Sequence, residues 1–514
     1  MNKQLLLVGL LALPLTSLAR VDSQPCDVND DFTSKTIFRD NPQFSNGRPE
    51  FLSLYRFDRA LLKKEGIWGS FQAVAFGGKS GSSAELARWF FPFRKTCLVV
   101  GEAPSVNDET GGSINGGSDA FKNNTQDILA NNFFINTVNH DFQSNICICP
   151  EQEYAGGGFN YHQVFTDDEE KGYWFDITVP VVQVKQRMNM SETIINQGVT
   201  LDGSPRSMTE AFMSSNLKFG KICPGELKQT AVSDVEMRIG RDGARGDHCH
   251  YTGFIGIVIP TSNKPTAKFL FEPIVGRAGH FGIEWGSNAG YEMWRNEDFS
   301  VIANCDINNT WLFAADELRS FDLVDKQWSR YIRVFTDSTA TVSTSGVNIF
   351  TKCMEIRPKG TWQVNSSFLL KYGKFEAEAG FNLYVRQSEA GKLTQPWTSN
   401  AGIAGTTAGH TMSLANMRMW DNGLITDDVD QSQLFADPSN NVDFVFRTIK
   451  ASDLNLQSAL HPACVAQTIY ATVGYNNEAA TCPGFAGFGA SYQFSHNNAA
   501  MNRWTVWGKI GVSV

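Results

Sequence analysis

The chain has 514 residues, of which 42% are hydrophobic, 12% aromatic and only 19% charged. This aromatic content excludes an intrinsically disordered protein. The 53 acidic and 44 basic residues give a net charge of -9, which argues against nucleic-acid binding. With 45 glycines and 37 phenylalanines, the composition is typical of an all-β protein, either several domains or one large barrel.

The first 19 residues have the pattern of a secretory signal peptide. Lys3 supplies a positive charge, residues 5–15 are apolar, and small residues stand at Ser17 and Ala19. We predict cleavage after Ala19, the alternative being an amphipathic core helix. No later apolar run approaches the roughly 18 residues of a membrane-spanning helix. The exported chain is therefore expected to be soluble or a membrane barrel, and residues 20–65 form a polar segment that enters the lumen or stays outside it.

Segments of alternating polarity follow along the chain and are predicted to be β-strands. Upstream they cover residues 66–77, 157–165, 172–187, 232–240, 251–260, 280–286, 299–313, 328–336 and 362–372. Pro180 interrupts the third of these and is tolerated only where its missing N–H is not needed. Between the strands, residues 208–217 are expected to form a short helix.

The segment 375–387 alternates most strictly. Phe375, Ala377, Ala379, Phe381, Leu383 and Val385 share one face, and Glu376, Glu378, Gly380, Asn382, Tyr384 and Arg386 share the other. Residues 468–475, 488–495 and 503–514 repeat the pattern. In a soluble sheet the apolar face would be the core, whereas in a membrane barrel it would meet lipid.

The length of these segments favours the barrel, because soluble strands usually have about five or six residues. We predict an all-β fold: a single closed antiparallel transmembrane β-barrel of about 14 strands (range about 12–16) over residues 66–514. Long external loops would interrupt it, the largest near 388–463.

Ten cysteines in an exported chain make disulfides plausible, but their connectivity cannot be read from the sequence. Cys147 and Cys149 lie on one face of an extended run. The most metal-like cluster is His248-Cys249-His250, although a strand entrance with ordinary polar residues explains it better. We expect no metal site, no cofactor and no catalytic residues.

An export signal, alternating strands of about ten residues and a final strand that ends the chain together resemble a Gram-negative outer-membrane β-barrel protein of the porin-like type. Val506, Ile510, Val512 and Val514 match the alternation of the closing strand of that class, although the terminal residue is valine rather than an aromatic. The resemblance implies residence in the outer membrane, contact with its lipid, and assembly machinery that recognises the C-terminal strand. It also implies that the chain ends at the periplasmic face, which places Cys464 and Cys482 at opposite ends of a strand, too far apart to bond.

The first functional hypothesis is a channel for passive diffusion of small solutes. Its pore-lining candidates are Glu376, Glu378, Tyr384 and Arg386, with Asp176 and Arg238 as weaker ones. The alternative for these residues is structural ion pairing between neighbouring strands.

Three other functions remain open. A surface binding or adhesion protein could use the 388–463 loop or the tripeptide Arg245-Gly246-Asp247. An importer of hydrophobic molecules could use the N-terminal segment as a plug, and an exported soluble enzyme or lectin would need β-sandwich domains. Solubility without detergent distinguishes the last of these from a barrel. The sequence does not identify the solute or the oligomeric state.

Overall fold

The computed structural model describes residues 34–54, 68–81, 84–102, 127–139, 141–165, 172–246, 248–338, 342–406, 434–436, 443–478, 482–495 and 499–513. The predicted signal peptide lies outside the described residues. Every helix in the described part of the chain is too short or too polar to cross a lipid bilayer.

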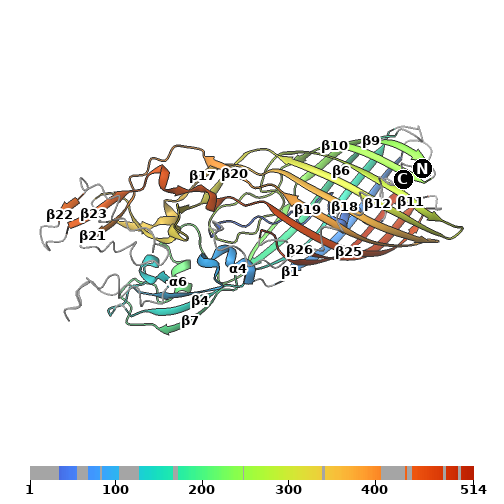
Figure 1. The fold of residues 1–514 in the computed structure, drawn as a ribbon. Coiled ribbons are helices and arrows are strands. Elements are labelled where there is room, and N and C mark those ends of the chain that lie inside the picture. The colour runs from blue at the N-terminus through green and yellow to red at the C-terminus, as the bar shows by residue number, and fades with distance from the viewer. Residues whose placement is uncertain are drawn as a thin grey trace, which may run out of the picture.

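Twelve strands in the described residues form a closed antiparallel barrel (Figure 1). In order around the wall they are β1 (Trp68–Ser80), β27 (Arg503–Ser513), β26 (Gly484–Ser495), β25 (Cys464–Asn477), β19 (Phe375–Arg386), β18 (Lys359–Tyr372), β12 (Phe299–Leu312), β11 (Gly282–Arg295), β10 (Cys249–Ile259), β9 (Val235–Gly246), β6 (Tyr173–Arg187) and β5 (Glu151–Val164). β1 pairs with β5 on one side and with β27, the last strand of the chain, on the other, and the β27–β1 pairing closes the ring. The predicted fold class is confirmed, with a strand number at the lower limit of the expected range.

The barrel turns its apolar side outward. On β19, Phe375 is 65% exposed on the outside, whereas Glu376 and Glu378 are 7% and 3% exposed and face the interior. Successive side chains of a strand point to opposite faces, so this reversal holds along the whole strand. In a soluble protein such an exterior would be a large unprotected apolar surface, whereas in a bilayer it meets acyl chains.

Aromatic side chains mark the height of this apolar band. Trp362 and Tyr372 both face outward on β18, at 49% and 65% exposure. Ten residues at roughly 3.4 Å each, tilted by roughly 40°, span about 26 Å along the barrel axis. Outer-membrane barrels carry aromatic girdles on either side of an apolar band about 25 Å tall. The spacing therefore fits a bilayer.

Pro180 lies at the point on β6 where the partner strand changes from β9 to β8. Residues 173–178 of β6 pair with β9, and residues 181–186 pair with β8 (Leu227–Val232). Ser233 donates its N–H to the Pro180 carbonyl (2.9 Å). The missing N–H of Pro180 therefore points toward the break between β8 and β9, where the ladder does not need it.

The connections at the two ends of the barrel differ greatly. Short turns join the strands at the end where β1 begins and β27 ends, whereas the long connections at the other end build a separate folded body (Figure 1). We call this body the cap. Cys464 begins β25 and Cys482 lies beyond its other end, as the strand order predicts, and both are free cysteines.

The cap is assembled from segments of five long connections. Its strands are β2 (Cys97–Gly101), β3 (Ile128–Leu129), β4 (Gln143–Cys147), β7 (Ser191–Asn196), β13 (Ala315–Ser320), β14 (Asp322–Leu323), β15 (Arg333–Phe335), β16 (Ser343–Ser345), β17 (Thr351–Arg357), β20 (Ala390–Leu393), β21 (Gly402–Thr406), β22 (Leu434–Ala436), β23 (Asp443–Thr448) and β24 (Leu454–Asn455). Its helices are α4 (Ala84–Phe90) and α6 (Met208–Met213), with the 3₁₀ turns η2 (Pro92–Arg94), η4 (Ala130–Phe133), η5 (Ser329–Tyr331), η6 (Gly346–Asn348), η10 (Ala451–Asp453) and η11 (Leu456–Ala459). The helix predicted at 208–217 is present as α6 over Met208–Met213, and residues 214–217 are not helical.

The cap has its own apolar core, and this core explains one wrong prediction. Residues 328–336 were expected to form a barrel strand, but they form η5 and β15 inside the cap. Trp328, Tyr331, Ile332 and Val334 are completely buried there. Their aromatic and β-branched side chains serve cap packing, which a strand period alone cannot distinguish from a lipid-facing wall.

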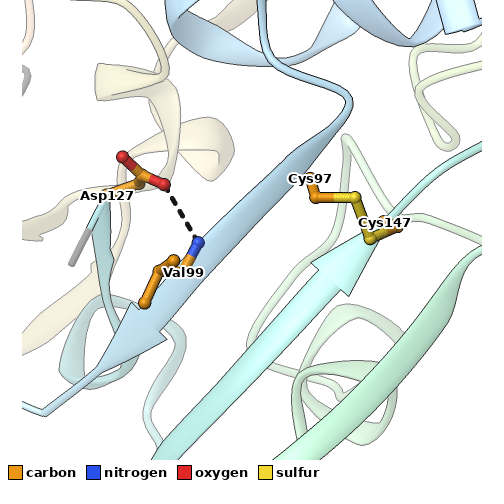
Figure 2. Close-up of a disulfide and its surroundings, with 4 residues drawn as sticks. All are labelled: Cys97, Val99, Asp127 and Cys147. Atoms are coloured by element: carbon orange, nitrogen blue, oxygen red, sulfur yellow. Dashed lines mark hydrogen bonds between the residues drawn. A yellow bond between two sulfur atoms is a disulfide. The ribbon is translucent and has the colours of Figure 1, made fainter. Parts of the chain in front are cut away.

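A disulfide joins two neighbouring strands of the cap. Cys97 on β2 faces Cys147 on β4 and is bonded to it, while Cys149 remains free (Figure 2). On the same strand the Val99 N–H donates to Asp127 (3.0 Å). The bridge closes a loop with a sequence separation of 50 residues, so it restricts the unfolded cap strongly.

The outward apolar face generates a first prediction. Phe488 is 67% exposed on β26, so Phe488→Lys would place a charge against acyl chains and cost about 2–4 kcal/mol of the free energy of unfolding in bilayers. Val138 is 56% exposed in the cap, so Val138→Lys should change the free energy of unfolding by less than about 0.5 kcal/mol. Urea unfolding in lipid vesicles measures both. Equal effects would contradict a lipid-facing wall.

Candidate functional site

Residues 34–54 run through the interior of the barrel, and we call them the plug. At the cap end, Thr36 Oγ1 donates to the Ser320 carbonyl (2.6 Å). At the opposite end, the Leu54 N–H donates to Glu378 Oε2 (3.0 Å). The plug contains the helical turn α2 (Pro49–Leu52). It therefore extends from the cap toward the end with short turns.

The middle of the plug is held by side chains of the barrel wall. The Asn46 N–H donates to Glu236 Oε2 (3.0 Å), and Thr178 Oγ1 donates to Asn46 Oδ1 (3.0 Å). Asn382 Nδ2 donates to the Gly47 carbonyl (3.1 Å), and Lys509 Nζ donates to the Ser53 carbonyl (3.1 Å). These contacts come from β6, β9, β19 and β27, so the plug is held from several sides of the lumen.

Two phenylalanines add apolar contacts to the plug. Phe44 stacks on Phe76 of β1 with ring centroids 5.6 Å apart, and Phe51 packs edge-on against Phe44 at 5.8 Å. Both rings belong to a buried cluster with Tyr470 and Trp507. The plug thus combines polar contacts along its length with one apolar anchor.

All six sequence-predicted pore-lining residues face the interior and are buried. Two of them hold the plug: Glu378 accepts from Leu54, and Arg386 Nη2 donates to the Arg39 carbonyl (2.9 Å). Tyr384 lines a small cavity beside Arg39 and Pro42.

The other three predicted residues contact the barrel wall. Arg238 pairs with Glu284 through two contacts of 2.8 Å, and Lys371 Nζ lies 3.1 Å from Glu376. Asp176 accepts from Asn160. Ion pairing between strands, the alternative considered for these residues, is therefore present for Arg238 and Glu376. Their part in solute selectivity stays a prediction.

The sequence reasoning missed a set of charged residues where the plug meets the cap. Arg39 of the plug contacts Glu317 Oε1 (2.5 Å) and Glu389 Oε1 (2.9 Å). Arg319 contacts the same two carboxylates at 2.6 and 3.5 Å, and His280 Nε2 lies 2.6 Å from Glu317. We call these five residues the junction cluster. They come from distant parts of the chain and show no shared sequence period, so no sequence signal could have joined them.

The electrostatics of this region favour the ionised forms of Glu317 and Glu389 and the neutral form of the neighbouring His461. Burial opposes ionisation, yet the charges of Arg319 and Arg39 outweigh it and hold the pKa values of Glu317 and Glu389 below the ordinary range. Next to the cluster, the Arg386 guanidinium donates to the His461 imidazole (2.6 Å). Burial and the charge of Arg386 lower the pKa of His461 well below its ordinary value.

A cavity remains between the plug and one side of the wall. It is lined by Asn46, Gly47, Phe51 and Leu52 of the plug and by Trp174, Arg238, Thr252, Phe254, Ser287, Asn288, Asp306, Ile307, Asn308, Gln363 and Asn365 of the barrel. Trp174 and Phe254 occupy space left by glycines, since a Cβ at Gly240 or Gly286 would collide with their rings. Small residues on one strand thus make room for the rings of the next.

The histidines of the His248-Cys249-His250 motif have other partners. His248 Nδ1 lies 3.4 Å from Glu292, and His250 Nε2 lies 2.8 Å from Asn288 Oδ1. In the described ranges of the chain, no three histidine, cysteine or acidic side chains are grouped as metal ligands. Arg245 and Gly246 end β9, at the end of the barrel away from the cap, and Asp247 lies outside the described residues.

No protein-family model matches the sequence, and no curated protein matches it. Several solved structures resemble the fold. An outer-membrane channel from Pseudomonas putida F1 is 7% identical, with 90% of this chain and 100% of that chain covered and a TM-score of 0.38. A FadL homologue from Pseudomonas aeruginosa is 9% identical, with 94% and 95% covered and a TM-score of 0.28. A mutant TodX monoaromatic hydrocarbon channel is 6% identical, with 94% and 96% covered and a TM-score of 0.33. These values assign no solute or activity to this chain.

The junction cluster generates a prediction about the plug. Arg39→Met would leave two buried carboxylates with Arg319 as the remaining guanidinium and cost about 3–5 kcal/mol of plug docking. A Ser53→Cys probe, fully buried in the closed lumen, should then react with a water-soluble maleimide at least about 100-fold faster. Peptide mass spectrometry measures the rate. Arg357→Met, at an exposed arginine of the cap that pairs with Glu355, should change the labelling rate little.

His461 generates a pH prediction. Because its pKa is lowered in the closed state, a hydrated His461 binds protons more readily, and the closed state loses stability as pH falls below about 6.5. The pKa values of Glu317 and Glu389 lie below the ordinary glutamate range, so they remain ionised between pH 7 and 5. Because maleimide reacts with the thiolate, labelling rates are taken relative to the exposed Cys353. The relative rate at Ser53→Cys should therefore rise from pH 7 to pH 5 and lose that dependence in His461→Gln. His248→Gln, at an exposed imidazole, should keep it.

Proposed function

We propose that this protein is a channel of the bacterial outer membrane whose lumen is closed by its own plug and which admits small solutes when the plug moves. The observation that carries the proposal is the plug itself, held inside a lipid-facing barrel mainly by polar contacts. Water can replace such contacts, because an intramolecular hydrogen bond contributes only about 0.5–1.5 kcal/mol net.

The ends of the barrel support an orientation. Outer-membrane barrels have short periplasmic turns and long external loops. We therefore place the cap outside the cell and the ends of β1 and β27 at the periplasm. In this orientation the end of β9, with Arg245 and Gly246, lies at the periplasmic side.

We propose two partners with this function. Acyl chains of the outer membrane would cover the outward face, and assembly machinery would recognise β27, the strand that closes the ring against β1. The transported class would be small solutes, with passage by diffusion once the plug has moved. No cofactor or enzymatic step enters this proposal.

A second candidate, surface binding, is favoured by the cap. A loop that only restricts pore entry needs no core of its own, yet the cap buries Trp89, Phe90, Phe212 and Trp328 and carries a disulfide. A folded external body can present a binding surface. Adhesion of cells that produce the full chain, compared with cells that produce a cap-deleted barrel, distinguishes this role from transport. Uptake of a labelled lipid tests import of hydrophobic molecules in the same cells.

Deletion of residues 34–54 tests the channel. We expect the intact protein to show rare small steps in planar bilayers, and the deletion variant to raise mean conductance at least about tenfold, because the plug fills the lumen. Heat-modifiable mobility on gels confirms that the barrel has formed. Lys35→Met serves as the control with the plug retained. A correctly folded deletion variant without conductance would contradict the proposal.

A further inference from the structure

The cavity between the plug and the wall is bordered by four amide side chains, each with one buried atom that lacks a hydrogen-bond partner. These are Asn46 Nδ2 of the plug, Asn308 Oδ1 of β12, and Gln363 Oε1 and Asn365 Oδ1 of β18. The four residues are between 1% and 8% exposed. A buried polar group without a partner costs about 1–3 kcal/mol. A ligand that forms hydrogen bonds in this cavity would supply the missing partners.

The charged groups at this cavity are already engaged. Arg238 is held by Glu284 (2.8 Å) and approached by Glu236 at 3.6 Å. Asp306 accepts from Asn288 and from Asn365 Nδ2 (3.1 Å). One positive and one negative side chain thus border the cavity, and neither sign of ligand charge is favoured. The atoms that lack hydrogen-bond partners belong to uncharged amides.

Apolar rings supply the rest of the lining. Phe51 belongs to the plug, Trp174 to β6 and Phe254 to β10. The cavity offers about 50 Å³ to the centres of water-sized molecules, which is room for several waters or one small solute. A fitting ligand therefore carries several polar groups on a compact carbon skeleton.

We propose that this cavity is a binding subsite for a small neutral polyhydroxylated solute. A hydroxyl group both donates and accepts, so it can satisfy the amide oxygens of Asn308, Gln363 and Asn365 as well as Asn46 Nδ2. The carbon skeleton packs against the rings of Phe51, Trp174 and Phe254. The inference rests on the proposed channel and names the class of solute that the closed channel binds.

The subsite also connects the solute to the plug. Asn46 and Gly47 form one wall of the cavity, and a Cβ at Gly47 would collide with the Gln363 amide and lie 3.2 Å from Asn308 Nδ2. Gly47 thus allows the Gln363 amide to approach the plug backbone at the edge of the cavity. A solute bound here touches both the plug and the barrel wall.

Three matched probes test the subsite on the purified full chain in glycerol-free detergent buffer. Glycerol is neutral, glycerate is its anionic counterpart, and 3-amino-1,2-propanediol is a cationic one of similar size. Saturation-transfer NMR titrations give their dissociation constants. We expect saturable binding of glycerol and at least tenfold weaker binding of both charged probes.

Two variants and one control locate the binding. Asn308→Leu removes an amide, and Gly47→Ala displaces the Gln363 amide without removing one; each should weaken glycerol binding at least tenfold. Asn304 faces the lumen on the same strand, donates to Ser367 Oγ (3.3 Å) and does not line the cavity, so Asn304→Leu should stay within twofold. Heat-modifiable mobility on gels confirms the fold of each variant, and Gly47→Ala keeps the test open if Asn308→Leu does not fold.

Three outcomes would overturn the inference: no saturable glycerol binding by the folded chain, tighter binding of a charged probe, or an equal loss in Asn304→Leu. Liposome swelling of the variant without residues 34–54 reports on the channel separately. Swelling without glycerol binding rejects the subsite and keeps the channel. Glycerol binding by a barrel that never conducts rejects the channel instead.

Discussion

The arrangement of barrel, plug and cap depends on one constraint: buried polar groups need hydrogen-bond partners. The barrel wall sends its apolar residues to the outside and its polar residues inward, where Glu236, Glu378 and Asn382 are nearly inaccessible to solvent. Polar side chains in such a place are unfavourable unless they form hydrogen bonds. The plug supplies these partners from its backbone at Asn46, Leu54 and Gly47. The closed lumen is therefore a consequence of the wall as much as of the plug.

The same requirement explains why the plug is joined to the cap. Arg39 reaches from the plug into a site where Glu317 and Glu389 are fully buried. Two carboxylates in such surroundings require cations, and Arg319 and Arg39 share that task. Plug and cap thus meet in one charged cluster. In the proposed channel, movement of the plug would separate Arg39 from these carboxylates, so the cluster would oppose opening.

Most barrel strands could be predicted from the sequence because alternation is a local property. The segments 375–387 and 503–514 correspond to β19 and β27, and period two places Glu376 and Arg386 on one face. That this face is the inner one followed from the barrel interpretation, not from the period. The same rule failed at residues 328–336, where Trp328 and Tyr331 pack in the cap. A local pattern indicates that a segment has an apolar face. It does not indicate whether that face packs against lipid or against the core of the cap.

The sequence by itself determined an all-β chain whose strands have one apolar and one polar face, and it placed all six candidate lumen residues inside the barrel. Only the tertiary structure decided that these residues meet a plug, that distant residues such as Arg39, Glu317 and Glu389 share one cluster, and that Asn46, Asn308 and Gln363 border one cavity. The physical reason is the range of the interactions. Alternation acts between neighbours along the chain, whereas contacts between plug, wall and cap form only after the ring of strands has closed.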